Sequence, residues 1–180
     1  MALSDAQKEI CSSDARFRVA VTGRRFGKTH VAMRELSRFA ATHNNQLVWY
    51  VAPSYRMAKG IVWDQLKGRL KDLRWVEQTN EAELTMRLKN GSKICLKGAD
   101  SPDSLRGVGL NFLVMDEFQD TDPRAWTEIL RPTLSDKNGH ALFLGTPRGV
   151  GSFSHEMYSM AKDTEDWNSF TYRTIDGGQV

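Results

Sequence analysis

The segment most able to do chemistry is a glycine-containing stretch that ends in Gly27-Lys28-Thr29. It matches the pattern G-x-x-x-x-G-K-[ST], except that Thr22 occupies the position of the first glycine. In this pattern, backbone N–H groups and a helix N-terminus surround phosphate oxygens, the lysine reaches the β- and γ-phosphates, and the hydroxyl binds Mg²⁺. The segment therefore predicts a nucleotide phosphate site formed by Thr22, Gly23, Arg24, Arg25, Phe26, Gly27, Lys28 and Thr29. The alternative is a chance Gly-Lys-Thr at a helix start.

Two arginines inside this loop are unusual for the pattern. Either Arg24 or Arg25 could place a positive charge near the γ-phosphate of a bound nucleotide. The competing interpretation, which applies more to Arg25, is an arginine that faces solvent.

A second candidate follows the apolar run at residues 112–115, where the chain continues as Asp116-Glu117. Asp116 could hold Mg²⁺ through water, opposite Thr29. Glu117 could orient and deprotonate the water that attacks the γ-phosphate. Two acids after a strand can also form a simple polar loop, but their position after a phosphate loop on the same sheet favours catalysis.

A third apolar run, at residues 141–144, leads into the turn Gly145-Thr146-Pro147. A threonine hydroxyl in this turn could respond to the presence of the γ-phosphate and couple it to the residues that follow. The alternative is an ordinary Gly-Pro turn.

The elements that must position these residues alternate between strand and helix. We expect strands at 18–21, 47–52, 112–115 and 141–144, and helices at 29–42, at 55–70, and from Pro123 with Asp122 as its cap. Asn90-Gly91 between two short runs predicts an antiparallel hairpin at an edge. Strands joined by helical crossovers predict an α/β fold with a mainly parallel sheet, helices on both faces, and the ligand at the carboxyl ends of the strands.

Composition bounds the class of protein. The 180 residues fit one domain, and 40% hydrophobic and 26% charged residues are typical of a soluble globular protein. We find no secretory signal and no apolar run near the roughly 20 residues that span a bilayer, so we expect a cytosolic protein. Cys11 and Cys95 are expected to be reduced, and the four histidines lack zinc-ligand spacing.

The charge is unevenly distributed along the chain. Residues 1–110 carry 19 basic against 11 acidic residues, a net charge of +8, which is consistent with phosphate ligands. The alternative is a basic surface that is merely solvated.

Together these motifs resemble the N-terminal ATPase domain of bacteriophage terminase large subunits, over nearly the whole chain. The stretch from Gly23 to Thr29 looks like the family's arginine-bearing Walker A motif. The segments 51–54 and 104–107, the Asp116-Glu117 pair and the 145–149 turn are similar to its later motifs in order and spacing.

The resemblance implies a P-loop NTPase of the additional-strand catalytic-glutamate type that uses ATP and Mg²⁺. It implies that Gln7 reads the adenine, that Arg24 senses the γ-phosphate in cis, and that Arg106 is a finger toward the neighbouring subunit's nucleotide. For Arg106 the alternative is a pair with Asp100 or Asp103 that holds its loop. Its partners would be double-stranded DNA, a homo-oligomeric ring, the portal protein and the terminase small subunit, in the host cell cytoplasm and with no membrane.

We expect residues 1–180 to form a single ATPase domain without the family's C-terminal nuclease. Two other functions fit the same motifs: a helicase-like or other DNA-dependent P-loop ATPase, and a non-catalytic nucleotide-binding assembly module. A helicase pairs two such domains, and Glu117 beside Asp116 argues against the non-catalytic module.

Overall fold

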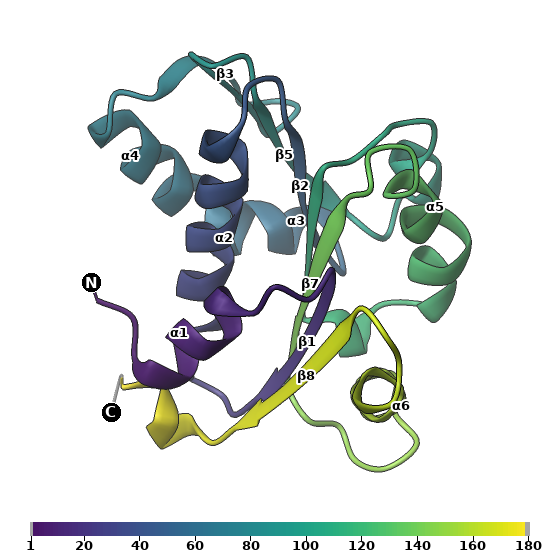
Figure 1. Cartoon of the computed structure of the whole chain (residues 1–180). Helices are drawn as coiled ribbons and strands as arrows, with labels where there is room; N and C mark the ends of the chain where they lie inside the picture. The colour runs from purple at the N-terminus through teal and green to yellow at the C-terminus, as the bar shows by residue number, and fades with distance from the viewer. Residues whose placement is uncertain (1, 179–180) are drawn as a thin grey trace.

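The computed structural model describes residues 2–178 and contains a single twisted sheet (Figure 1). Its strands are β1 (Phe17–Thr22), β2 (Leu47–Ala52), β3 (Val76–Asn80), β4 (Thr85–Leu88), β5 (Lys93–Gly98), β6 (Phe112–Asp116), β7 (His140–Gly145) and β8 (Trp167–Tyr172). The eight strands lie in the order β3-β4-β5-β2-β6-β7-β1-β8. The six strands β5-β2-β6-β7-β1-β8 are parallel to their neighbours in the sheet. β4 is antiparallel to both of its neighbours, β3 and β5.

Helices cover both faces of the sheet (Figure 1). On one face lie α1 (Asp5–Ser12), α2 (Lys28–Thr42), α3 (Tyr55–Ala58), the π-helical η1 (Lys59–Trp63) and α4 (Asp64–Asp72). On the other lie η4 (Ala125–Leu130), α5 (Arg131–Thr133) and α6 (Phe153–Lys162). Short 3₁₀ segments are η2 (Pro102–Leu105), η3 (Phe118–Asp120) and η5 (Thr174–Gly177). Each face of the central strands is buried, which is why these strands are continuously apolar.

The predicted fold class is confirmed, with strands β1, β2, β6 and β7 where the sequence places them. β7 lies between β6 and β1, so one additional strand separates the phosphate-loop strand from the strand that ends in Asp116. The Asn90-Gly91 hairpin is also present, as β4 and β5. Asp122 Oδ1 accepts the backbone N–H of Arg124 at 2.9 Å, as expected of a helix cap.

Two strands were not predicted, and both lie at sheet edges. β3 has the sequence Val-Glu-Gln-Thr-Asn and is half exposed, so it lacks the apolar pattern that marks a strand. β8 pairs with β1 but buries fully only Phe170 among its six residues. At the edge where the hairpin was predicted, the outermost strand is therefore β3, one place beyond β4.

A buried ion pair fixes the phosphate-loop strand against the helix that follows it. Arg18 on β1 contacts Glu35 on α2 at 2.7 Å, and both side chains are at most 1% exposed. Arg18 Nη1 also donates to the carbonyl of Ile10, at the end of α1, at 2.9 Å. Arg18 thus joins three elements whose relative positions determine where the phosphate loop lies.

Among residues 2–178, no helix has the length and apolar character needed to cross a bilayer.

Candidate nucleotide-binding site

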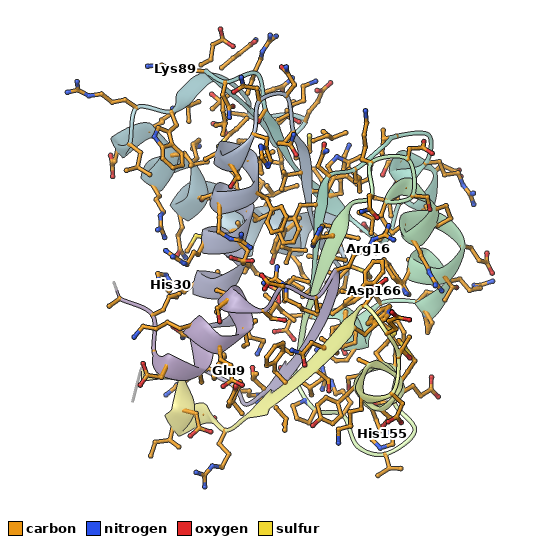
Figure 2. All side chains as sticks on the ribbon, viewed as in Figure 1. Glu9, Arg16, His30, Lys89, His155 and Asp166 are labelled. Atoms are coloured by element: carbon orange, nitrogen blue, oxygen red, sulfur yellow. The ribbon has the colours of Figure 1, made fainter. Side chains whose placement is uncertain are left out.

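The loop between β1 and α2 has the backbone that a phosphate site requires. Gly27 precedes α2 with φ of 92°, in the left-handed region where glycine carries no side-chain penalty. Gly23 lies so close to η5 that a Cβ would be 2.6 Å from Thr174 Oγ1. A cavity of about 360 Å³ opens beside this loop, and its lining includes Arg25, Lys28 and Thr29. His30, labelled in Figure 2 at the first turn of α2, lines the same cavity.

Three loops predicted separately meet at one point. Lys28 Nζ lies 3.1 Å from Thr146 Oγ1 and 3.7 Å from Glu117 Oε1. Thr146 Oγ1 is in turn 3.5 Å from Glu117 Oε2. The three residues follow β1, β7 and β6, and adjacent parallel strands bring their carboxyl ends to the same edge of the sheet.

Asp116 is almost fully buried at the end of β6, and each of its oxygens accepts a hydrogen bond. Tyr50 on β2 donates its hydroxyl to Oδ2 at 2.6 Å, and the Glu117 backbone N–H donates to Oδ1 at 2.9 Å. Burial raises the pKa of Asp116 to about 6, because the charged carboxylate loses water. Tyr50 was not singled out in the sequence, where it is one apolar-strand residue among several.

These groups fit a magnesium ion. Each Asp116 oxygen keeps lone-pair capacity beyond its one hydrogen bond, and Thr29 supplies a hydroxyl at the phosphate cavity. Mg²⁺ usually keeps several waters and binds through one or two carboxylates plus substrate phosphates. No cluster of three His, Cys, Asp or Glu that could hold a metal without a ligand occurs among residues 2–178.

Glu117 leaves the strand in a left-handed conformation, with φ of 48°, which is uncommon for a residue with a side chain. Its Oε2 accepts a hydrogen bond from Gln119 Nε2 at 2.6 Å. Gln119 Oε1 accepts the backbone N–H of Thr146 at 3.1 Å. Sequence reasoning missed Gln119; its only signal was a polar side chain two residues after Glu117.

The Gly145-Thr146-Pro147 turn packs directly on η3. A Cβ at Gly145 would lie 2.6 Å from Phe118 Cε1 and 2.7 Å from Gln119 Oε1, so the close approach requires glycine. Thr146 faces the site, whereas Pro147 is exposed.

Gln7 is 1% exposed and lies behind the phosphate loop. Its Nε2 donates to the carbonyls of Phe26 at 2.8 Å and Gly177 at 3.2 Å, and its Oε1 accepts the N–H of Ser4. Gln7 therefore connects α1, the phosphate loop and η5. A second contact ties α1 to the end of β8, just before η5: the Tyr172 hydroxyl donates to Oε2 of Glu9, which Figure 2 labels on α1, at 2.6 Å.

The remaining candidates are Thr22, Arg24, Arg25 and Arg106. Arg24 and Arg25 are exposed, and Arg25 has φ of 61°. Thr22 is fully buried and its hydroxyl has no hydrogen-bond partner. Arg106, 59% exposed, lies 3.7 Å from Asp103 and lines a second cavity of about 460 Å³, beside η4 and α5 and apart from the phosphate cavity.

Comparison with known proteins decides the family. The family described as "Terminase large subunit, T4likevirus-type, N-terminal" matches residues 19–176. The chain belongs to the terminase large subunit family. It is 36% identical over 165 residues to the terminase large subunit of Escherichia phage T5, covering 88% of this chain and 37% of that protein. The terminase large subunit of Thermus phage G20c is 31% identical over 173 residues, covering 86% of this chain and 35% of the relative. The chain thus spans little more than a third of these terminases.

Solved terminase structures have the same fold. The ATPase domain of the Thermus phage P74-26 large terminase superposes with a TM-score of 0.85 at 28% identity, covering 96% of this chain and 82% of that one. The large terminase of another thermophilic bacteriophage, in complex with ADP, gives a TM-score of 0.84 at 19% identity, covering 99% of this chain and 47% of that one. The second likeness concerns the fold alone.

Proposed function

We propose that this part of the terminase binds Mg-ATP and hydrolyses it to drive double-stranded DNA into a procapsid. The observation that carries the proposal is the convergence of Lys28, Glu117 and Thr146 at one edge of the sheet. ATP hydrolysis uses a lysine that binds the phosphates and a carboxylate that orients the attacking water, and here the Thr146 hydroxyl contacts both.

In this reaction Lys28 and the N–H groups of the phosphate loop hold the β- and γ-phosphates. A water oxygen bonds to the γ-phosphorus while the bond from that phosphorus to the ADP oxygen breaks, and the water's proton passes to Glu117. Thr29 and Asp116 would hold the Mg²⁺, which when bound would supply positive charge to the phosphate oxygens.

Three further roles belong to this proposal. Arg24 supplies charge at the γ-phosphate from within the loop that carries Lys28. Gln7 reads the adenine, which requires its amide to exchange bonds now made to Ser4, Phe26 and Gly177. Arg106 acts in a neighbouring subunit, and its position beside η4, outside the phosphate cavity, supports that role.

We also propose its partners, to which membership of the family lends support: double-stranded DNA, further copies of this chain in a ring, the portal protein and the terminase small subunit, in the host cell cytoplasm. We assign residues 1–180 to the ATPase domain alone and propose no nuclease activity for them.

The test is ATP hydrolysis by the purified chain with Mg²⁺, with and without double-stranded DNA. We expect hydrolysis that Glu117→Gln slows by about 10²- to 10⁴-fold. Asp64→Asn, which changes an exposed acid on α4, is the matched control and should keep the parent rate. Binding of ATP without hydrolysis under all assembly conditions would favour a non-catalytic module instead.

A further inference from the structure

Gln119 occupies the space between the acidic loop and the Gly145-Thr146-Pro147 turn, and all of its polar atoms are used there. Nε2 donates to Glu117 Oε2 at 2.6 Å and to Asp120 Oδ2 at 3.2 Å. Oε1 accepts the Thr146 N–H at 3.1 Å. Carboxylates only accept and a backbone N–H only donates, so a single orientation of the amide satisfies all three partners.

The side chain has little freedom to leave this position. Gly145 approaches so closely that a Cβ there would be 2.7 Å from Gln119 Oε1. A second contact joins the same two loops, since Arg148 Nη2 donates to both carboxylate oxygens of Asp120 at 2.8 and 2.9 Å. The Arg148–Asp120 pair is exposed to solvent, and such a pair stabilises the protein little by itself. Gln119 is less exposed and therefore makes the stronger connection between the two loops.

The two oxygens of Glu117 face different partners. Oε1 faces Lys28 at 3.7 Å, and Oε2 accepts from Gln119 Nε2 at 2.6 Å and lies 3.5 Å from the Thr146 hydroxyl. A nucleotide phosphate attracts the lysine ammonium, which weakens its attraction to Glu117. The contacts of Oε2 then determine where the carboxylate points, and the bond from Gln119 is the shorter of the two.

We infer that Gln119 positions Glu117 for activation of the attacking water and transmits displacement of Glu117 to Thr146. The inference rests on the proposed function, because it assigns Gln119 a part in that hydrolysis. Gln119 is a positioning residue, since it acts on the water only through Glu117. One planar amide carries both bonds, so a shift of Glu117 toward the nucleotide moves the acceptor of the Thr146 N–H. The backbone of the turn thereby receives a signal through Gln119, in addition to the direct contacts of the Thr146 hydroxyl with Lys28 and Glu117.

Two variants separate the two bonds. Gln119→Met has a similar volume and can make neither bond. Gln119→Glu keeps an oxygen for the Thr146 N–H but places a second negative charge beside Glu117. Gln78→Met, on the exposed strand β3, is the matched control.

We expect both Gln119 variants to bind ATP within about twofold of the parent, because Lys28 is unchanged, and to lose about 10- to 100-fold in kcat. Backbone amide exchange, followed by NMR without nucleotide, should separate them. The Thr146 amide should exchange faster in Gln119→Met and remain protected in Gln119→Glu, while the Phe143 amide in β7 is unchanged in both.

A double variant distinguishes positioning from a general loss of structure. Adding Gln119→Met to Glu117→Gln should lower kcat no further, because Gln119 acts through Glu117. Parent kcat in Gln119→Met, or a loss that only follows the folded fraction, would overturn the inference. So would unchanged Thr146 exchange in that variant, a result that does not depend on activity. Parent activity in Glu117→Gln would instead refute the proposed role of Glu117.

Discussion

The Tyr50 hydroxyl donates a hydrogen bond of 2.6 Å to Asp116 Oδ2 from the neighbouring strand. Some residues hydrogen-bond to a metal-binding carboxylate without touching the metal. Replacing such a residue commonly lowers metal affinity or activity by about 10- to 100-fold. Tyr50→Phe should therefore raise the Mg²⁺ concentration for half-maximal ATPase activity by about tenfold. Tyr158→Phe, on α6, should leave it unchanged. An unaltered Mg²⁺ dependence in Tyr50→Phe would show that Asp116 needs no such orientation.

Lys28 and Glu117 are in contact but should fail differently when replaced. Lys28→Ala should abolish ATP binding, because the ammonium group holds the phosphates. Glu117→Gln should bind ATP and lose about 10²- to 10⁴-fold in hydrolysis, because the amide cannot take a proton from water. Equilibrium binding and single-turnover hydrolysis measure these separately. Loss of ATP binding in Glu117→Gln would show that the Glu117 carboxylate is needed to bind ATP and not only to activate the attacking water.

Arg106 should complete the site of a neighbouring subunit. Arginine fingers contribute about 10³ to 10⁵ in rate, so Arg106→Ala protein should be inactive alone. Mixed with inactive Glu117→Gln protein, it should regain activity, since some sites then combine an intact Glu117 with a neighbour's Arg106. Arg87→Ala, which removes an exposed arginine on β4, is the control. Rings shown to be mixed yet inactive would exclude action in trans.

Binding to DNA should depend on salt and not on sequence. A motor that moves along DNA must contact backbone phosphates, and each phosphate contact releases counterions. Fluorescence anisotropy with one duplex and its scrambled version should give equal affinities that fall steeply as salt rises. A preference for one sequence that persists at high salt would indicate a recognition module.

Removing one partner of the buried Arg18–Glu35 pair should be costly. Glu35→Gln leaves the Arg18 charge buried without its counter-ion, and we expect a loss of about 3 to 5 kcal/mol in the free energy of unfolding. Glu77→Gln, from the exposed Glu77–Arg87 pair, should change it by less than about 1 kcal/mol. Replacing Arg18 and Glu35 together with methionine should recover most of the loss. Urea denaturation measures all three, and an equal, small effect of both single variants would contradict the argument.

The buried Arg18–Glu35 pair should also make the free energy of unfolding depend on pH. Burial would raise the pKa of Glu35, but hydrogen bonding to Arg38 and the charge of Arg18 hold the pKa below its ordinary value of 4.5. A carboxylate whose pKa is lower in the folded state stabilises the protein above the unfolded pKa. This contribution should therefore decline as the pH falls below 4.5, and Glu35→Gln should lack that decline.

The central fold and the phosphate loop were predictable because their signals are local. Buried strands such as β2 are continuous apolar runs, and the loop before Lys28 has a fixed spacing. The contacts of Tyr50 and Gln119 were not predictable, since they depend on which strands become neighbours. The edge strands β3 and β8 were missed because half-exposed strands carry little hydrophobic pattern.

The insertion of β7 between β1 and β6 has a consequence for reaction geometry. Neighbouring strands are about 4.8 Å apart, so the strand axes that lead to Lys28 and Glu117 are separated by about 10 Å. That width is set by backbone hydrogen bonds. The Lys28 and Glu117 side chains now span it and meet at 3.7 Å, and a phosphoryl group and one water would fit between the two loops once these side chains separate. The distance between the two strands that lead to the reacting groups is therefore set by the backbone hydrogen bonds of the sheet. Substitutions in the loops can change the rate of hydrolysis and leave this distance unchanged.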